Sequence, residues 1–489
     1  AGTSQYEKRG IAVKVPCWNP ENCVQCNQCS FVCPHAVIRP FLMTEEETKR
    51  YGAKGIPANG KGLEGYRYRI QISPLDCTGC GNCADVCPGK KGKKALVMES
   101  IDDHIQEHDI FMNLHENVGY KENVMDRMSV KGSQFAQPLL EFSGACAGCG
   151  ETPYAKVVTQ LFGERMVIAN ATGCSSIYGG SVPSTVYTTN SCGSGPAWAS
   201  SLFEDNAEYG LGIRIAVKAI RKELQQKLSL LKELTSHEKL RDTIEDYLNV
   251  IGNAEQEKLF SKEMIKLLSE ENYSAEEKVL VDVALKQKEY LVDKSVWIFG
   301  GDGWAYDIGY GGLDHVIASG ENVNILVFDT EVYSNTGGQS SKATPIGAVA
   351  KFAASGKRIN KKDLGMIATA YGYVYVAQVG IGADKGQFVK ALKEAEAYDG
   401  PALIIAYAPC INHGIKKGMN KSMEEMKDAV KSGYWTMMRF NPSLAAEGKN
   451  PLSVDSKEPT ESFRDFIMGE ERYKSLKIKF PERAEKLFA

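Results

Sequence analysis

The chain has 489 residues, of which 43% are apolar and 24% are charged, and its formal net charge is −3. Such a chain can bury a sizeable core, and its near-neutral balance gives no overall field that would favour nucleic acid or a membrane surface as a partner. No run approaches the roughly 20 apolar residues of a membrane span, and no secretory signal is present. Because the chain opens on Ala1 rather than Met, we expect it to be a piece of a longer polypeptide.

The 14 cysteines are unevenly distributed, and the first large group forms two tight runs. Repeated Cys-x-x-Cys spacing favours metal ligation over disulfides, which indicates the reducing cytoplasm of an anaerobic cell. Each run is a triple at regular spacing that ends in Cys-Pro: Cys23, Cys26, Cys29 and Cys33-Pro34, then Cys77, Cys80, Cys83 and Cys87-Pro88.

This spacing is typical of bacterial ferredoxins with two [4Fe-4S] clusters, in which the last cysteine of each run ligates the other cluster. The predicted ligand sets are therefore Cys23, Cys26, Cys29 and Cys87 for one cluster, and Cys77, Cys80, Cys83 and Cys33 for the second. Zinc ribbons are the alternative, but a doubled triple with Cys-Pro is more specific than a Cys-x-x-Cys pair. The basic loop 90–94 beside Cys87 either steers an acidic ferredoxin or is simply solvated.

Short apolar runs recur in the rest of the chain. Residues 44–68 are interpreted as an insertion and residues 105–140, which show no clear period, as a connection. Continuous apolar runs then follow at 166–170, 296–300, 324–328, 373–379 and 402–408. Such runs, separated by helical stretches, are typical of parallel strands covered on both faces, so the sequence predicts an α/β fold with a parallel sheet.

Two segments depart from this pattern. Residues 211–294 are rich in Lys, Glu and Leu, with apolar residues at helical spacing, and are predicted to form an inserted arm of amphipathic helices rather than a sustained coiled coil. Residues 440–489 are polar and partly helical, a C-terminal arm suited to wrapping a partner subunit. We therefore divide the chain into a ferredoxin-like domain, 1–115, and an α/β domain, 116–489.

Residues 296–339 have the pattern of one βαβ unit, with a Gly-Asp-Gly turn after its first strand, a helix over 304–319 and a polar loop after its second strand. Both strand ends face the sheet edge where ligands bind in open α/β folds. The Asp302 carboxylate, the Thr330 hydroxyl and the Val332 carbonyl are thus predicted ligands of Mg²⁺, which proteins usually share with phosphates. The helix start favours such an anion. A plain Rossmann-like turn is the alternative.

Four further cysteines are expected near this edge. Cys146 and Cys149 lie in a glycine-rich loop, whereas Cys174 and Cys410 each follow a predicted strand, as Asp302 does. They predict a third [4Fe-4S] cluster beside the diphosphate, the alternative being that Cys174 and Cys410 are small core residues. Three remaining residues show no partner pattern and are interpreted as structural or hydrogen-bonded: Cys17, Cys192 and His413.

The chain resembles pyruvate:ferredoxin (flavodoxin) oxidoreductases of the long single-chain anaerobic type, over nearly its whole length. The resemblance is carried by ENCVQCNQCSFVCPH, CAGCGETPY, ATGCSS, GGDGWAYDIGYGGLDHV and DTEVYSNTGGQSSKATPIGA. Within it, the Gly-Asp-Gly unit resembles the thiamine diphosphate motif of transketolases and pyruvate decarboxylases. The resemblance implies that this chain is the C-terminal portion, a ferredoxin domain and a thiamine diphosphate domain.

The resemblance also implies roles for individual residues. Asn335 would point toward the reacting carbon as a catalytic residue, and the loop cysteines Cys146 and Cys149 would join Cys174 and Cys410 around the proximal cluster. Thiamine diphosphate would be lined by Glu151, Cys174, Asp302, Gly303, Trp304, Ala305, Thr330, Glu331, Val332, Tyr333, Ser334 and Asn335.

The implied activity is the reversible oxidative decarboxylation of pyruvate with coenzyme A to acetyl-CoA and CO2. Electrons would pass from thiamine diphosphate through three [4Fe-4S] clusters to ferredoxin or flavodoxin, in a homodimer. The family's N-terminal region, which contacts pyruvate and coenzyme A, has no counterpart here, so this chain alone is expected to be inactive. The alternatives are an oxidoreductase for another 2-oxo acid and a non-catalytic polyferredoxin subunit.

Overall fold

The computed structural model describes residues 1–181, 183–269 and 272–488, and a central sheet dominates it. The strands of this sheet are β6 (Met166–Ala171), β7 (Ala197–Ser201), β8 (Ser295–Gly301), β9 (Asn324–Asp329), β10 (Tyr375–Val379), β11 (Ala402–Tyr407), β12 (Met438–Phe440) and β13 (Leu452–Val454). They are ordered β13-β12-β10-β11-β9-β8-β6-β7. The strands from β10 to β7 run parallel, and β12 and β13 extend the β10 edge in antiparallel pairing.

The predicted parallel sheet is confirmed, since all five continuous apolar runs form strands within it. Their side chains are almost entirely buried, because helices cover both faces of the sheet. The prediction missed β7, β12 and β13, which lie at the two edges of the sheet. These edge strands are short and partly exposed, so they carry no continuous apolar run.

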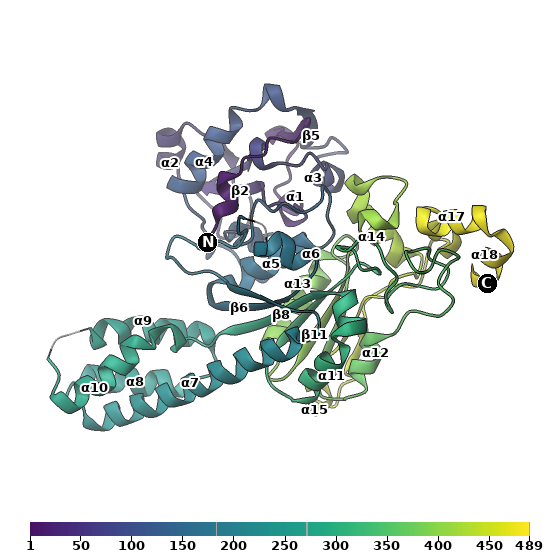
Figure 1. Ribbon diagram of the computed structural model, residues 1–489. Coiled ribbons are helices and arrows are strands. Elements are labelled where there is room, and N and C mark those ends of the chain that lie inside the picture. Colours follow the sequence, from purple (N-terminus) through teal and green to yellow (C-terminus); the bar gives the residue numbers. More distant parts are fainter. Residues whose placement is uncertain (182, 270–271, 489) are drawn as a thin grey trace.

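Helices on both faces complete the α/β layers (Figure 1). Helices α5 (Thr152–Phe162) and α13 (Lys385–Ala397) lie on one face, and α11 (Tyr310–Ala318) and α12 (Leu364–Thr369) on the other. The helix expected over 304–319 is present, but it begins as a wide π-helical turn, Gly303–Ile308. Two very short helices, α6 (Cys174–Ser176) and α15 (Ser443–Ala446), lie in loops.

The N-terminal region forms a separate small unit that lies against the α5 side of the sheet (Figure 1). It contains the ribbon of β1 (Lys14–Trp18) and β5 (Leu96–Ser100), and a sheet in the order β2-β4-β3, formed by β2 (Ile38–Met43), β4 (Arg67–Ile72) and β3 (Ile56–Pro57). Its helices are α1 (Gln28–Phe31), α2 (Glu45–Tyr51), α3 (Asn82–Val86) and α4 (Glu107–Asn117). Phe31 and Val32 of this unit are fully buried in the main core of the α/β region.

The interpretation of residues 105–140 as a plain connection is wrong in its first part, where α4 forms. Phe111, Leu114 and Val118 are buried along one side of this helix, at the spacing of an amphipathic face. The polar residues between them hid that period in the sequence.

The predicted helical arm is confirmed, and it begins slightly earlier than expected. It consists of α7 (Asn206–Leu234), α8 (Glu238–Asn249), α9 (Ala254–Leu268) and α10 (Ala275–Lys286). The start of α7 contacts β6 and β8, and the rest of the arm has its own core around Leu228, Ile244 and Met264. Within the part of the chain that is described, the helices lack the combined length and apolar character needed to cross a membrane.

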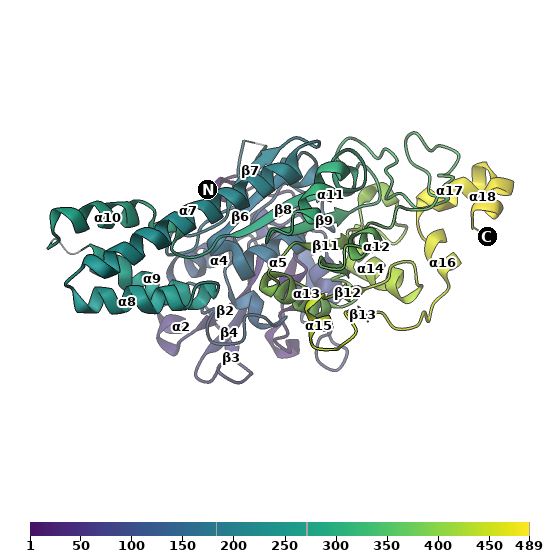
Figure 2. The ribbon, with the colours of Figure 1, turned by 90° about the horizontal axis from the view of Figure 1, so that it is seen from below.

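The C-terminal segment lies at the opposite end of the molecule from the arm (Figure 2). After α14 (Ser422–Lys431), it forms α16 (Phe463–Met468), α17 (Glu471–Lys479) and α18 (Pro481–Phe488). Arg472, Tyr473 and Leu476 of α17 are buried, so this segment packs on its own chain.

Candidate cofactor and cluster sites

Four predicted site residues follow four neighbouring parallel strands. Cys174 comes shortly after β6, Asp302 directly after β8, Thr330 directly after β9 and Cys410 shortly after β11. The carboxyl ends of these strands therefore bring the four side chains to one edge of the sheet. Strand β6 is flanked by β7 on one side and β8 on the other, and such a reversal of strand order is where open α/β sheets bind ligands.

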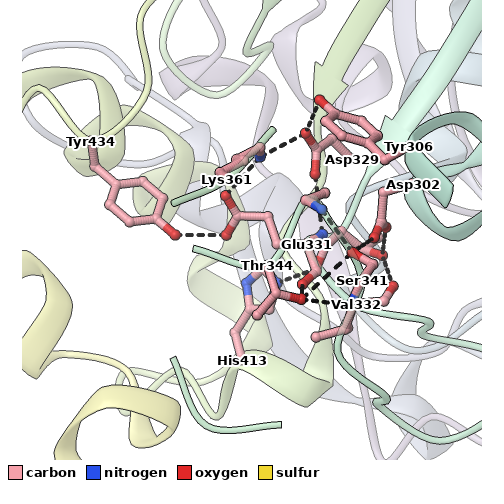
Figure 3. Close-up of polar contacts among 12 residues, drawn as sticks. Asp302, Tyr306, Asp329, Glu331, Val332, Ser341, Thr344, Lys361, His413 and Tyr434 are labelled. Carbon is pink, nitrogen blue, oxygen red and sulfur yellow. Dashed lines mark hydrogen bonds and ion pairs between the residues drawn. The ribbon is translucent and has the colours of Figure 1, made fainter. Parts of the chain in front are cut away.

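The three predicted magnesium ligands converge at this edge. Thr330 Oγ1 lies 2.9 Å from Asp302 Oδ1 and 3.1 Å from the carbonyl oxygen of Val332. Ser341, which the sequence analysis missed, donates a hydrogen bond of 2.5 Å to Asp302 Oδ2 (Figure 3). Oxygen donors of these kinds suit Mg²⁺.

The charge of Asp302 supports the same assignment. Its side chain is fully buried, and burial, followed by the nearby Asp329, raises its pKa well above the usual range. No basic side chain of the described residues forms an ion pair with it. A bound divalent cation would supply the missing positive charge, so the donor set fits the metal.

The loop that carries Thr330 and Val332 is held by the residue between them. Glu331 has a φ of 61°, a left-handed conformation that is uncommon for a residue with a side chain. Its carboxylate points away from Asp302 and accepts a hydrogen bond from Tyr434 (Figure 3). Glu331 therefore turns its side chain out of the cofactor pocket while its two neighbours face the metal site.

Two basic residues pair with these carboxylates. Lys361 Nζ lies 2.7 Å from Asp329 and 3.0 Å from Glu331, and Arg472 of α17 lies 2.7 Å from both Glu331 and Glu470. Burial alone would raise the pKa of Glu331, but the charges of Lys361 and Arg472 lower it to about 2. Neither base could be identified from the sequence, since both are far from the motif along the chain.

His413 supports the loop through a hydrogen bond to its backbone. Its Nε2 lies 2.7 Å from the carbonyl oxygen of Thr330, and because that oxygen can only accept, Nε2 carries the proton. Burial, followed by the charge of Arg472, lowers the pKa of His413 to about 3, so the ring is neutral. The structure thus places His413 as a hydrogen-bonded residue next to a predicted magnesium ligand.

A narrow pocket adjoins the metal ligands and contains most of the predicted cofactor residues. Its lining includes Glu151, Cys174, Asp302, Gly303, Trp304, Val332, Tyr333, Ser334 and Asn335, together with Thr172, Ser175 and Phe203, which the sequence analysis missed. Ala305 is buried behind this lining. A Cβ atom on Gly303 would lie 2.5 Å from the Tyr333 ring, so only glycine fits there.

The four cysteines predicted to ligate the third cluster line a neighbouring cavity of about 560 Å³. Cys146, Cys149, Cys174 and Cys410 all contribute to its wall. The cavity shares Glu151, Cys174 and Asn335 with the cofactor pocket, so the two sites are continuous. Burial raises the pKa of the shared Glu151 to about 7.

Several N-terminal cysteines lie close enough to one another to influence each other's pKa. Burial raises the pKa of Cys29, and the added effects come from Cys26, Cys23 and Cys87. The corresponding neighbours of Cys83 are Cys80, Cys33 and Cys77, followed by Cys29. All the cysteines are free thiols.

The spacing of these thiols argues against a single zinc ion. Tetrahedral zinc would hold its sulfur ligands about 3.8 Å apart. Among the described residues, the only trio of candidate ligand atoms within 4.8 Å of one another is Cys17, Glu99 and His104. No three described thiols of the predicted sets therefore lie that close together.

The trio around Cys17 satisfies its own hydrogen bonds. His104 Nε2 lies 2.7 Å from Glu99, and the Cys17 thiol, whose pKa is raised by burial and then by Glu99, bonds the same carboxylate. Cys192 is exposed and lies in a turn with its backbone amide bonded to Asn190. Both agree with the structural interpretation of these cysteines.

Comparison with known proteins gives two family matches. Residues 282–406 match the thiamine pyrophosphate enzyme, C-terminal TPP binding domain, and residues 22–91 match the 4Fe-4S dicluster domain. The chain thus carries domains for thiamine diphosphate and for [4Fe-4S] clusters.

Curated relatives match the chain from end to end. A pyruvate:ferredoxin oxidoreductase of Moorella thermoacetica is 58% identical over 100% of this chain and 42% of its own length. A pyruvate-flavodoxin oxidoreductase of Klebsiella pneumoniae is 55% identical over 100% of this chain and 41% of its own length. An NADP⁺-dependent pyruvate dehydrogenase of Euglena gracilis is 47% identical over 99% of this chain and 27% of its own length. The chain therefore spans about two fifths of the first two relatives.

Proposed function

Because the chain belongs to the family of pyruvate:ferredoxin (flavodoxin) oxidoreductases, as the counterpart of one region of its longer members, we propose that it supplies the cofactor-binding and electron-relay part of such an enzyme. The reaction is the reversible oxidative decarboxylation of pyruvate with coenzyme A to acetyl-CoA and CO2. The observation that carries this proposal is the continuity of the cofactor pocket with the four-cysteine cavity through Glu151, Cys174 and Asn335.

The cofactor part of the proposal rests on the edge of the sheet. Asp302, Thr330 and the Val332 carbonyl hold Mg²⁺, and the glycine turn at Gly303 lets the backbone approach the diphosphate. Bound thiamine diphosphate supplies the electron sink that decarboxylation of a 2-oxo acid needs. Asn335 lies on both cavities, as a group directed toward the reacting carbon would.

Three [4Fe-4S] clusters form the electron-relay part. Cys146, Cys149, Cys174 and Cys410 hold the one beside the cofactor pocket, and the two crossed sets of the N-terminal unit hold the others. Clusters take up single electrons, so a row of them passes the two electrons of the reaction one at a time. The fully buried Phe31 and Val32 fix the N-terminal unit to the α/β region, which supports a fixed spacing between the clusters.

The partners follow from the same proposal. Ferredoxin or flavodoxin accepts the electrons, and pyruvate and coenzyme A bind through a region that this chain does not span. We place the domain boundary near residue 115, as the sequence predicts. We place the protein in the cytoplasm, where reduced thiols such as these persist. We propose that it forms a homodimer.

The test is pyruvate-dependent reduction of ferredoxin by the full-length enzyme, with Cys410→Ser compared with Cys192→Ser. We expect Cys410→Ser to lose ferredoxin reduction while still binding thiamine diphosphate, and Cys192→Ser to behave as wild type. Turnover of 2-oxoglutarate or an indolepyruvate in preference to pyruvate would show that the proposed substrate is wrong. Full activity in Cys410→Ser would contradict the relay.

A further inference from the structure

Helix α5 carries a buried lysine at the contact between the two parts of the molecule. Lys156 is only 1% exposed. Its ammonium donates a 3.0 Å hydrogen bond to the Phe31 carbonyl and a second, short one to the Ser30 carbonyl. Ser30 and Phe31 lie between Cys29 and Cys33, and the crossed ligation assigns these two cysteines to different clusters.

No carboxylate among the described residues forms an ion pair with Lys156. The buried arginines differ, because each has an acidic partner: Arg39 with Glu141, Arg221 with Glu257, Arg439 with Asp455 and Arg472 with Glu331. A buried charge without a partner is costly, and two carbonyl oxygens carry no net charge to offset it. The acidic groups that act on Lys156 are the thiols of Cys33 and Cys29.

We propose that Lys156 is a positioning residue for electron transfer, which places a fixed positive charge between the two N-terminal clusters and raises their reduction potentials. The proposal rests on the cluster ligands proposed above. Each cluster, with its four thiolates, gains one electron on reduction, and no bond is formed or broken. The added negative charge is stabilised by the ammonium, which acts strongly because the site is buried and its effective dielectric constant is low. Charge and hydrogen bonding near the sulfurs are known determinants of cluster potentials.

The position of Lys156 along α5 gives this charge a functional consequence. The helix begins directly after Glu151. Cys149 lines the four-cysteine cavity, and Glu151 lines both that cavity and the cofactor pocket. One helix therefore joins the proposed proximal cluster to the contact with the other two. Lys156 lies about one turn into this helix, and raising the potentials of the two clusters near it favours electron flow away from the cofactor.

Lys131 provides a matched control. It also lies near a predicted cluster, since Cys26 and Cys23 act on its pKa, and its ammonium bonds a backbone carbonyl, that of Asn59. Unlike Lys156 it is partly exposed, so water and salt screen its charge.

The test is a potentiometric EPR titration of the cluster-loaded protein, with iron content measured for every variant. Lys156→Gln keeps a hydrogen-bond donor without the charge, Lys156→Met removes both, and Lys156→Arg keeps the charge. In Lys156→Gln and Lys156→Met we expect the oxidised-to-reduced ratio at fixed potential to rise about tenfold, a shift of about 59 mV to lower potential for a one-electron couple. Lys156→Arg should stay near wild type, and Lys131→Met should shift less.

Unchanged potentials in iron-replete Lys156→Gln would overturn this inference alone. Wild-type protein without iron would overturn it together with the proposed cluster ligands. Loss of iron from Lys156→Gln and Lys156→Met, with full iron in Lys156→Arg, would support the pairing of this charge with the clusters.

Discussion

The cofactor loop and the contact between the N-terminal unit and α5 treat buried positive charge in opposite ways. In the loop, Lys361 lies between Asp329 and Glu331, and although burial acts to lower its pKa, these carboxylates raise it. At the contact, Lys156 has no carboxylate partner among the described residues, and burial lowers its pKa to about 8. The cofactor loop contains carboxylates that neutralise its buried lysine. At the contact, we propose that a cluster bound by cysteines supplies the negative charge.

This difference separates two kinds of site. The loop from Asp329 to Ser341 is held in place by side chains of the same chain, including Arg472 from the C-terminal segment. By the proposal above, the contact around Lys156 gains its negative counter-charge only from bound clusters. We therefore expect the two regions to respond differently to removal of iron.

The largest expected effect is that of iron chelation. Without clusters, Lys156 and the thiols lose their mutual stabilisation, so backbone amides of residues 28–33 and 152–162 should exchange hydrogen faster. Amides of residues 329–341 should keep their protection, because their ion pairs are unaffected. Hydrogen exchange followed by mass spectrometry on the loaded and iron-free protein tests this, and equal loss of protection in both regions would break the comparison.

A substitution at Arg472 sharpens the account of the loop. Arg472→Met leaves the buried carboxylate of Glu470 without its arginine partner and leaves Glu331 paired with Lys361 alone, and should lower the free energy of unfolding by about 3–5 kcal/mol. The double variant with Glu331→Gln should lose less than the sum of the two single variants. Additive losses in a denaturant series would show that the pair is not coupled.

Loss of a proposed metal ligand should weaken cofactor binding more than loss of a residue that only supports this ligand. Asp302→Asn removes the only carboxylate of the proposed magnesium site and should weaken magnesium-dependent binding of thiamine diphosphate most. Ser341→Ala removes only the hydrogen bond to Asp302 and should weaken it by about 10-fold. Calorimetric titration measures both, with Asp314→Asn on α11 as the control outside the pocket.

The smallest expected effect concerns pH. Because the pKa of His413 is lowered to about 3 in the fold, its contribution to stability is complete above about pH 6.5 and is lost as the pH falls from there toward 3. Between pH 7.5 and 5, wild type should lose about 2 kcal/mol more than His413→Gln. Thermal unfolding at the two pH values measures this, with His237→Gln on the arm as control; equal losses in wild type and His413→Gln would contradict it.

The sequence predicted those parts of the molecule that depend on local pattern. Cysteine spacing predicted the ligand sets, which remain a proposal, and continuous apolar runs correctly predicted β6, β8, β9, β10 and β11. The placement of Cys174, Asp302 and Cys410 at one edge of the sheet followed from parallel pairing, whereas the order of the strands came only from the structure.

The rest depends on contacts that no local pattern records. Arg472 meets Glu331 from a distant helix, and Ser341 reaches Asp302 across a loop that has no regular structure. Lys156 did leave a local signal, since it is the one charged residue in the apolar segment TPYAKVVTQLF, all of which is buried. A single lysine inside such a helix could have been flagged as a candidate buried charge.

The most direct test of the account is anaerobic analysis of iron, sulfide and thiamine diphosphate in the purified chain and in Cys410→Ser. Three [4Fe-4S] clusters and one cofactor site predict about twelve irons and one thiamine diphosphate per wild-type chain, and about eight irons in Cys410→Ser. A wild-type chain with about eight irons and no thiamine diphosphate would contradict it, and would leave only the two clusters of a ferredoxin-like protein.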